Sequence, residues 1–202
     1  YTFTCQYYVM ENYPRAEVEY SFIDRNKSVY PEGFAALLQE QVDYMASVVI
    51  TDEEIDYMKK KCVFLPIWYF TFLKGYRFNP SEVDIRQDEE GHLSITVKGK
   101  WFSTIMWEMP LLSCISELVH TLNGDIDRYD PELEQARARE KSERIFSAGL
   151  VLGDMGTRRR LSFAHQDMVV RTMTEVYAER QWPGKFTGTS NVWLAKKYNI
   201  SC

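Results

Sequence analysis

A loop that runs from Asp154 to Arg160 carries three consecutive arginines at the end of a short apolar segment, Leu150–Leu152. Guanidinium groups bind carboxylates and phosphates through paired, charge-assisted hydrogen bonds, so such a cluster suits an anionic substrate. The alternative is a solvated basic start of the helix that follows, and composition does not decide between the two. Basic residues at a helix N-terminus would oppose the helix dipole, which slightly favours a functional interpretation.

A second loop, Gly188-Thr189-Ser190-Asn191, occupies the corresponding place about 35 residues later, after the apolar segment Lys185–Thr187. Its small residues permit close approach of the backbone, and free N–H groups and hydroxyls there could hold an anion. Serine and asparagine are also ordinary helix N-caps, and for this motif alone capping is the more common explanation.

The elements that must position these loops form a repeated pattern of strand, loop and helix. The expected order is a buried strand at Leu150–Leu152, a loop at Gly153–Arg160, a helix at Ser162–Arg180, a strand at Lys185–Thr187 and a helix at Asn191–Tyr198. This pattern is typical of successive units of an α/β barrel or wound sheet, which bind ligands at the carboxyl ends of their strands.

The residues before this repeat predict a mixture of strands and helices. In chain order we expect a strand at Glu17–Phe22, helices at 34–45 and from the capping box at Thr51, a short aromatic helix from Leu65-Pro66 through Phe72, a hairpin of Val83–Arg86 with Leu93–Val97, a central buried helix at Ser103–Thr121 interrupted early by Pro110, and a charged helix at Pro131–Phe146. We therefore divide the chain into a mixed α+β domain, residues 1–125, and the start of an α/β barrel domain, residues 126–202.

Composition limits the possible partners. The 202 residues are 45% hydrophobic, which is enough for a substantial core, and carry a formal net charge of -5. That charge provides no general field for nucleic acid or anionic lipid. No apolar run approaches the roughly 18–20 residues that a membrane span needs. We expect a soluble cytoplasmic protein that binds neither nucleic acid nor membrane.

The sequence predicts no metal site within this chain. Four cysteines are far apart and form no CxxC pair, which indicates free thiols: Cys5, Cys62, Cys114 and Cys202. The three histidines, His92, His120 and His165, have no cysteine or carboxylate partners at metal-ligand spacing, so structural or exposed roles are favoured. We expect Glu108 to be a structural charge with an interaction partner and not a general base.

The sequence begins at Tyr1 without an initiator methionine, and it ends at Cys202 directly after a predicted helix. We therefore expect it to be a piece of a longer protein.

Several spaced segments together resemble the nicotinate phosphoribosyltransferases, from Tyr1 to about Tyr198. The segments that carry the resemblance are Val18–Arg25, Phe64-Leu65-Pro66 with Tyr69 and Phe72-Leu73, Tyr76–Pro80, Trp107–Leu112 with Ile115–Leu118, Gly156–Arg160 and Gly188–Asn191.

The resemblance implies an α/β fold in which an α+β N-terminal domain packs on an irregular α/β barrel of the type II phosphoribosyltransferase kind, incomplete in this chain. It implies a homodimer with shared active sites. It also implies a role in NAD biosynthesis and pyridine nucleotide salvage. In that glycosyltransferase reaction, nicotinate attacks C1 of phosphoribosyl pyrophosphate (PRPP) with Mg²⁺ present and expels pyrophosphate. Hydrolysis of ATP as co-substrate is coupled, as in a ligase, through a phosphohistidine.

The resemblance also assigns site residues. Tyr1 matches a tyrosine that reaches the neighbouring subunit and stacks on the pyridine ring, and Arg158 matches an arginine that contacts the substrate anion. Ser190 falls where the nicotinamide-using relatives have an aspartate. Met155 stands where most relatives have a phenylalanine on the other face of the ring, and methionine can pack there through its sulfur. The expected substrate-binding residues are Tyr1, Met155, Gly156, Arg158, Thr189, Ser190 and Asn191.

The catalytic residues are not identified within this chain. In the family, the phosphorylated histidine lies in a Gly-Thr-x-Ala-His-Glu segment expected shortly after Cys202, and the acidic PRPP motif is expected later still. Ala164-His165-Gln166 lacks the preceding Gly-Thr and lies in a predicted helix, so His165 is not assigned that role.

Three alternatives stay open. A nicotinamide-using relative is disfavoured by Ser190, and a quinolinate-using relative would call for more basic residues around the ring. The third is a non-catalytic α/β binding module of the same fold, which would need neither the histidine motif nor the acidic motif.

Overall fold

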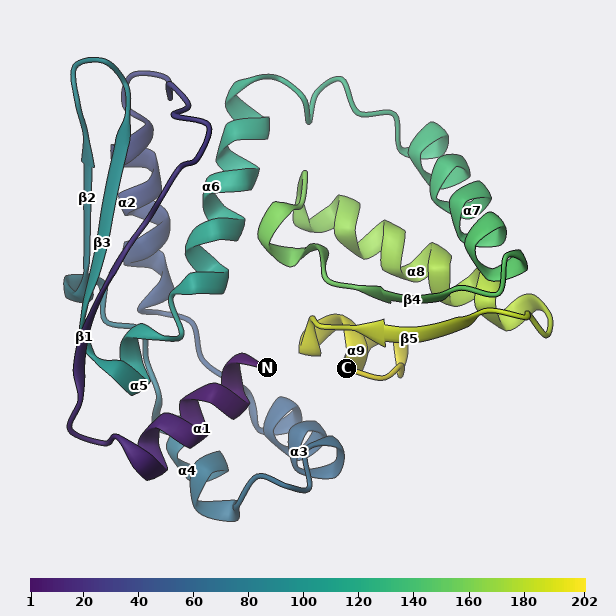
Figure 1. Cartoon of the computed structure of the whole chain (residues 1–202), viewed down its shortest axis with the longest axis horizontal. Helices are drawn as coiled ribbons and strands as arrows, with labels where there is room; N and C mark the ends of the chain where they lie inside the picture. The colour runs from purple at the N-terminus through teal and green to yellow at the C-terminus, as the bar shows by residue number, and fades with distance from the viewer. The chain divides into compact units, whose positions relative to one another are not determined.

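The computed structural model describes residues 1–202, and its packing separates two compact units, residues 1–118 and 119–202 (Figure 1). The division falls inside helix α6 (Glu108–Leu122). The domain boundary expected at residue 125 stays a prediction. No helix has both the length and the apolar character that crossing a membrane requires.

The first unit contains a three-stranded antiparallel sheet. Strand β3 (Leu93–Lys100) lies in the middle, between β1 (Glu17–Ser21) and β2 (Val83–Gln87). The predicted hairpin of β2 and β3 is confirmed, and its turn is held by Asp88, which accepts a 2.8 Å hydrogen bond from the His92 N–H. The predicted strand at β1 is also confirmed, but its alternation of polar and apolar residues did not show that it would pair with β3.

The helices of this unit follow the sequence pattern closely. Helix α2 (Phe34–Met45) buries Phe34, Leu38 and Val42, which recur every fourth residue. Helix α3 (Asp52–Lys61) begins with the predicted capping box, in which Thr51 Oγ1 accepts from the Glu54 N–H and the Glu54 carboxylate accepts from the Thr51 N–H. Helix α4 (Ile67–Gly75) runs three residues beyond the predicted end. Helix α1 (Thr2–Asn12) was not predicted.

The expected central buried helix is wrong in two respects. The segment forms two helices, α5 (Trp101–Thr104) and α6, and Pro110 lies in the first turn of α6. A proline there costs no hydrogen bond, because the first N–H groups of a helix have no partner in the helix. Within α6 only Leu111, Ser113 and Ile115 are buried, so most of this helix is not enclosed.

The second unit confirms the α/β class. Helix α7 (Pro131–Ser147) precedes strand β4 (Val151–Asp154), the 3-10 helix η2 (Gly156–Arg159), helix α8 (Phe163–Glu179), strand β5 (Lys185–Thr189) and helix α9 (Val192–Tyr198). Strands β4 and β5 pair in parallel, with α8 as the crossover (Figure 1). This β-α-β unit is the repeating unit of α/β barrels and wound sheets. Its core consists of Phe146, Val170, Met173, Val176, Phe186 and Leu194.

The expectation that β4 is buried is wrong. The side chain of Val151 is 68% exposed, whereas Leu152 packs against the core of the unit. Successive side chains of a strand point to opposite faces, and only one face of this two-stranded sheet meets the core. Both strands also extend further than predicted, through Asp154 and Thr189, which are paired across the sheet.

Candidate functional site

The carboxylate of Asp154 connects the ends of the two parallel strands. Its Oδ2 accepts a 2.6 Å hydrogen bond from Thr189 Oγ1 and a 3.0 Å bond from Gln166 Nε2, while Oδ1 accepts from the Gly156 N–H at 2.9 Å. Its backbone carbonyl accepts a 2.8 Å bond from the Ser190 N–H. Asp154 thereby holds β4, β5, η2 and α8 in one fixed arrangement.

A second set of bonds joins the two predicted loops through Thr157. Its Oγ1 lies 3.0 Å from Gln166 Nε2 and 3.4 Å from Asn191 Nδ2. The Asn191 Oδ1 accepts from the N–H groups of Trp193 and Leu194, so Asn191 is the N-cap of α9. The two loops that the sequence singled out therefore form one polar site at the carboxyl ends of β4 and β5.

Two glycines permit this close packing. A Cβ on Gly156 would lie 2.9 Å from Asp154 Oδ1, so a side chain would obstruct the approach of the Gly156 N–H to that carboxylate. At Gly188, φ is +98° and a Cβ would lie 1.9 Å from the Ser201 carbonyl oxygen. That carbonyl accepts from the Thr189 N–H at 3.0 Å, so glycine is needed where this segment crosses β5.

Three backbone N–H groups of the second loop are not free to bind an anion, contrary to expectation. Those of Thr189, Ser190 and Asn191 donate to Ser201 O, Asp154 O and Thr189 Oγ1 respectively. The first N–H groups of α9 are used by the Asn191 side chain. These five N–H groups therefore do not form an anion site.

The arginine cluster follows the carboxyl end of β4, as the sequence analysis expected, but it does not form the start of the next long helix. Arg158 and Arg159 are exposed in η2, and Arg160 follows with its guanidinium 5.2 Å from the centre of the Phe163 ring. Helix α8 begins only at Phe163, with Ser162 as its N-cap. The arginines are therefore not in the first turn of α8, and the argument from its dipole does not apply.

The other predicted substrate residues differ in exposure. Met155 is 78% exposed between β4 and η2, and Ser190 is exposed between β5 and Asn191. Thr189 is buried, and its hydroxyl is used within the chain, so it supports the site and does not offer a free hydroxyl. Tyr1 belongs to the first unit, where it precedes α1 and is 92% exposed.

Sequence reasoning missed the polar residues that organise the site. Asp154 was seen only as part of the loop, and Thr157 and Gln166 were not assigned a role. Gln166 lies at the fourth position of α8 and is 4% exposed. A polar residue in the first turns of a helix that follows an arginine-rich loop is the one available signal, and it is weak.

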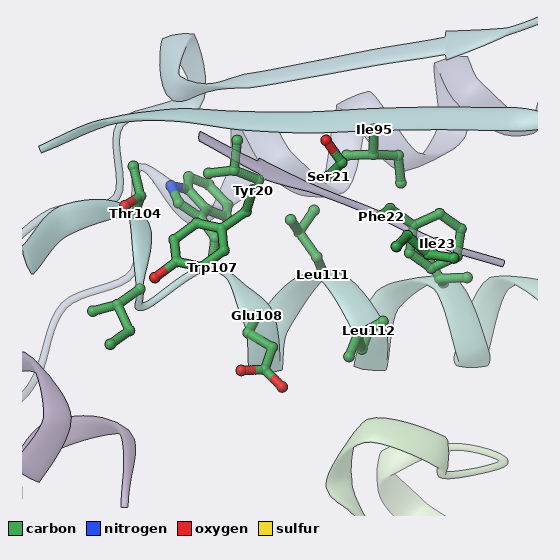
Figure 2. Close-up of a pocket in the computed structure, with 13 residues that line it drawn as sticks. Tyr20, Ser21, Phe22, Ile23, Ile95, Thr104, Trp107, Glu108, Leu111 and Leu112 are labelled. Carbon is green, nitrogen blue, oxygen red and sulfur yellow. The ribbon is translucent and has the colours of Figure 1, made fainter. Parts of the chain in front are cut away.

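The first unit contains an apolar cavity of about 360 Å³ that includes none of the predicted site residues (Figure 2). It lies between strands β1 and β3 and helices α5 and α6. Figure 2 shows the Glu108 carboxylate pointing away from the strand that carries Tyr20. The cavity thus offers apolar surface but no group suited to an anionic substrate.

The histidines have separate environments. His92 lies with Asp88 and Glu90 in the β2–β3 turn, where their potential ligand atoms are within 4.8 Å of one another, an arrangement that the sequence analysis missed. His165 lies in α8, as expected, with its ring 5.4 Å from that of Tyr129. Burial lowers the pKa of His165, and the charge of Glu134 partly offsets that shift. The expected free thiols are confirmed at all four cysteines.

Comparison with known proteins identifies the relatives of the chain. Residues 1–116 match the family model of the nicotinate phosphoribosyltransferase N-terminal domain, and residues 150–202 match that of the nicotinate phosphoribosyltransferase family. The nicotinate phosphoribosyltransferase of Chromohalobacter salexigens is 36% identical over 99% of this chain and 50% of its own length. A probable nicotinate phosphoribosyltransferase of Schizosaccharomyces pombe is 32% identical over 100% of this chain and 49% of its own.

Solved structures agree with this relationship. The crystal structure of nicotinate phosphoribosyltransferase from Porphyromonas gingivalis matches with a TM-score of 0.86 and 31% identity. That of a putative nicotinate phosphoribosyltransferase from Saccharomyces cerevisiae matches with a TM-score of 0.88 and 31% identity. Each match covers 99% of this chain and 50% of the other, so the chain spans about half the length of these relatives.

Proposed function

Because this chain belongs to the nicotinate phosphoribosyltransferase family, we propose that it contributes the nicotinate-binding part of an enzyme that forms nicotinate mononucleotide from nicotinate and PRPP. The observation that supports this most directly is the joining of the two loops at the ends of β4 and β5 through Asp154 and Thr189. Parallel α/β folds bind their ligands at such strand ends.

In the proposed site, Arg158 binds the nicotinate carboxylate and Met155 covers one face of the pyridine ring. Both side chains are exposed beside Thr157, on a segment that Asp154 fixes through the Gly156 N–H. An arginine can form two parallel hydrogen bonds to a carboxylate, and a methionine sulfur packs favourably on an aromatic ring. Ser190 is uncharged, so it does not repel the carboxylate of an acid substrate.

The proposed chemical step is a displacement at C1 of the ribose. The pyridine nitrogen forms a bond to C1 while the bond from C1 to the pyrophosphate oxygen breaks, and the bonding electrons leave with pyrophosphate. Because the site holds the pyridine ring in a fixed orientation, much of the entropy of bringing the two reactants together is lost on binding and does not add to the barrier of the chemical step. The residues described here bind and orient nicotinate in that step.

The proposal assigns no metal to these strand ends. Mg²⁺ requires oxygen ligands, and both carboxylate oxygens of Asp154 already accept hydrogen bonds from the chain. The residues present therefore do not fit a magnesium ion, and we derive no step through one. ATP hydrolysis through a phosphohistidine belongs to the proposal for the full-length protein, but no histidine of this chain is assigned to it.

We further propose a homodimer in which Tyr1 of one subunit stacks on the ring bound by the other. Its 92% exposure supports this role, because the ring is accessible at the start of α1. An aromatic face is well suited to a flat heterocycle.

The test is turnover by the full-length protein with PRPP, Mg²⁺ and ATP. Nicotinate, nicotinamide and quinolinate are supplied separately, and the mononucleotides are separated by chromatography. Product from nicotinate supports the proposal, and preference for one of the other two acceptors would assign the protein to that relative. No product from any of them would indicate a binding module without this chemistry.

A further inference from the structure

We propose that Thr157 is a substrate-contacting residue whose hydroxyl donates a hydrogen bond to a negatively charged oxygen of the substrate or product, either the pyridine carboxylate or a phosphate. The inference rests on the proposed function and adds a residue to that site. It follows from the directions of the hydrogen bonds around Thr157, which two amide side chains determine.

The first amide is that of Asn191. Its Oδ1 accepts 3.1 Å hydrogen bonds from the N–H groups of both Trp193 and Leu194. Backbone N–H groups only donate, so this end of the amide must be the oxygen. The other end, 3.4 Å from Thr157 Oγ1, is therefore the NH₂ group, which only donates.

The second amide is that of Gln166. One end lies 3.0 Å from Asp154 Oδ2, which also accepts from the hydroxyl of Thr189. An amide oxygen in that place would face a carboxylate oxygen with no hydrogen between them, so the NH₂ group must lie there. The same nitrogen is 3.0 Å from Thr157 Oγ1 and donates to it.

A threonine hydroxyl has two lone pairs and one hydrogen. Both amides donate to Thr157 Oγ1, so its lone pairs are used and neither amide nitrogen accepts its hydrogen. The hydrogen must point away from these two partners. Thr157 is partly exposed and directly precedes Arg158, the residue that the proposed function assigns to the substrate anion, so an acceptor for this hydrogen is expected in the bound substrate.

An independent observation indicates that a group outside the chain completes this site. Gln166 Oε1 is buried without a hydrogen-bond partner, and the whole residue is only 4% exposed. A buried carbonyl oxygen without a partner is costly, and such groups in folded proteins are usually paired with protein, water or ligand. This acceptor belongs to the same side chain that holds Thr157 in its donor orientation.

Calorimetric titration of the full-length protein with nicotinate mononucleotide and with nicotinamide mononucleotide tests the inference. Thr157→Val removes the hydroxyl at nearly constant shape and should weaken binding by about tenfold to a hundredfold, the value of one hydrogen bond to a charged group. A loss for both ligands would assign the contact to the phosphate, which they share. A loss for nicotinate mononucleotide alone would assign it to the carboxylate. Unchanged binding of both would overturn the proposal.

The conservative variant Thr157→Ser separates substrate contact from packing. It keeps the hydroxyl and should bind both ligands within about threefold of wild type. A loss as large as that of Thr157→Val would show that binding depends on the shape of this side chain, so the loss in Thr157→Val could no longer be assigned to the hydroxyl and the proposal would be overturned. If the wild-type protein forms no mononucleotide from any acceptor, the proposed function fails first, independently of these comparisons.

Asn191→Asp tests the direction of the hydrogen bonds. Aspartate caps a helix as well as asparagine does, but its second oxygen would accept the Thr157 hydrogen and turn it away from the ligand. The variant should therefore weaken binding far more with Thr157 present than in the Thr157→Val background, where only the added charge acts. Equal losses in the two backgrounds would contradict the proposed orientation.

Discussion

Thr189 Oγ1 donates a 2.6 Å hydrogen bond to Asp154 Oδ2, which joins two residues 35 positions apart at the ends of β4 and β5. Thr189 is 3% exposed, and its hydroxyl also accepts from the Asn191 N–H at 3.1 Å. This bond fixes the position of one substrate loop relative to the other.

Thr189→Val should lower the free energy of unfolding by about 1.5–3 kcal/mol, because a charge-assisted bond is lost and the Asn191 N–H is left without its acceptor. The loss should be much smaller in the Asp154→Ala background, since the partner is already absent. Urea denaturation of the four proteins measures this coupling. Thr187→Val is the matched control on the same strand, where an exposed hydroxyl bonds to the Leu152 carbonyl. Equal losses in both backgrounds would refute the coupling.

Arg158→Ala should weaken binding of nicotinate and its mononucleotide by on the order of 1.5–3 kcal/mol, and Arg158→Lys should recover only part because it lacks the paired geometry. Titration of the full-length variants gives the affinities. Arg159→Ala, which removes the neighbouring exposed arginine, serves as the control. Should Arg158→Ala bind both ligands as wild type does, Arg158 is a solvated charge.

Ser190→Asp should reduce the use of nicotinate far more than that of nicotinamide. Two like charges at about 4 Å repel by roughly 4 kcal/mol at an effective dielectric near 20, before any relaxation or protonation. The N–H groups of Thr189, Ser190 and Asn191 already donate within the chain, so they do not offset the added charge. The test is to measure kcat/KM for nicotinate and for nicotinamide with the wild-type protein and with Ser190→Asp. A decline by the same factor for both would mean that the substitution only disturbs the loop.

Tyr1→Ala and Arg158→Ala should complement each other in the full-length protein. If each site combines Tyr1 of one subunit with Arg158 of the other, a heterodimer of the two variants keeps one intact site. Activity at low nicotinate concentration should therefore rise when the two impaired variants are mixed under conditions that allow subunit exchange. Heterodimers that form without any rise in activity would exclude shared sites.

Acid should destabilise the second unit partly through His165. Burial lowers its folded-state pKa below the ordinary value of 6.5, so the unfolded chain binds a proton more readily than the folded chain. The stability associated with the neutral ring is complete above pH 6.5 and declines as the pH falls from there towards the lowered pKa. In urea denaturation from pH 7.5 to 5.5, His165→Gln should show a shallower decline than wild type. Parallel curves would contradict this assignment.

Local patterns predicted most of the helices and strands because their signals lie within a few residues. The spacing of Phe34, Leu38 and Val42 and the capping box at Thr51 needed no tertiary information. The errors arose where burial or length depended on distant contacts. The apolar residues of α6 indicated a helix but not that most of them would stay partly exposed, and Val151 indicated a strand but not which side of β4 would meet the core.

The sequence by itself determined the residue types available at the site: the arginines, a loop of small residues, and polar side chains at the ends of two strands in a β-α-β pattern. Only the tertiary structure decided how their hydrogen bonds are used. Three loop N–H groups that were expected to be free for an anion donate to Ser201, Asp154 and Thr189. The Thr157 hydroxyl is oriented by residues 9 and 34 positions away. Each donor or acceptor can form only a few hydrogen bonds. Its partners depend on the register of β4 with β5 and on the packing of α8 against these strands, and no short stretch of the chain determines either.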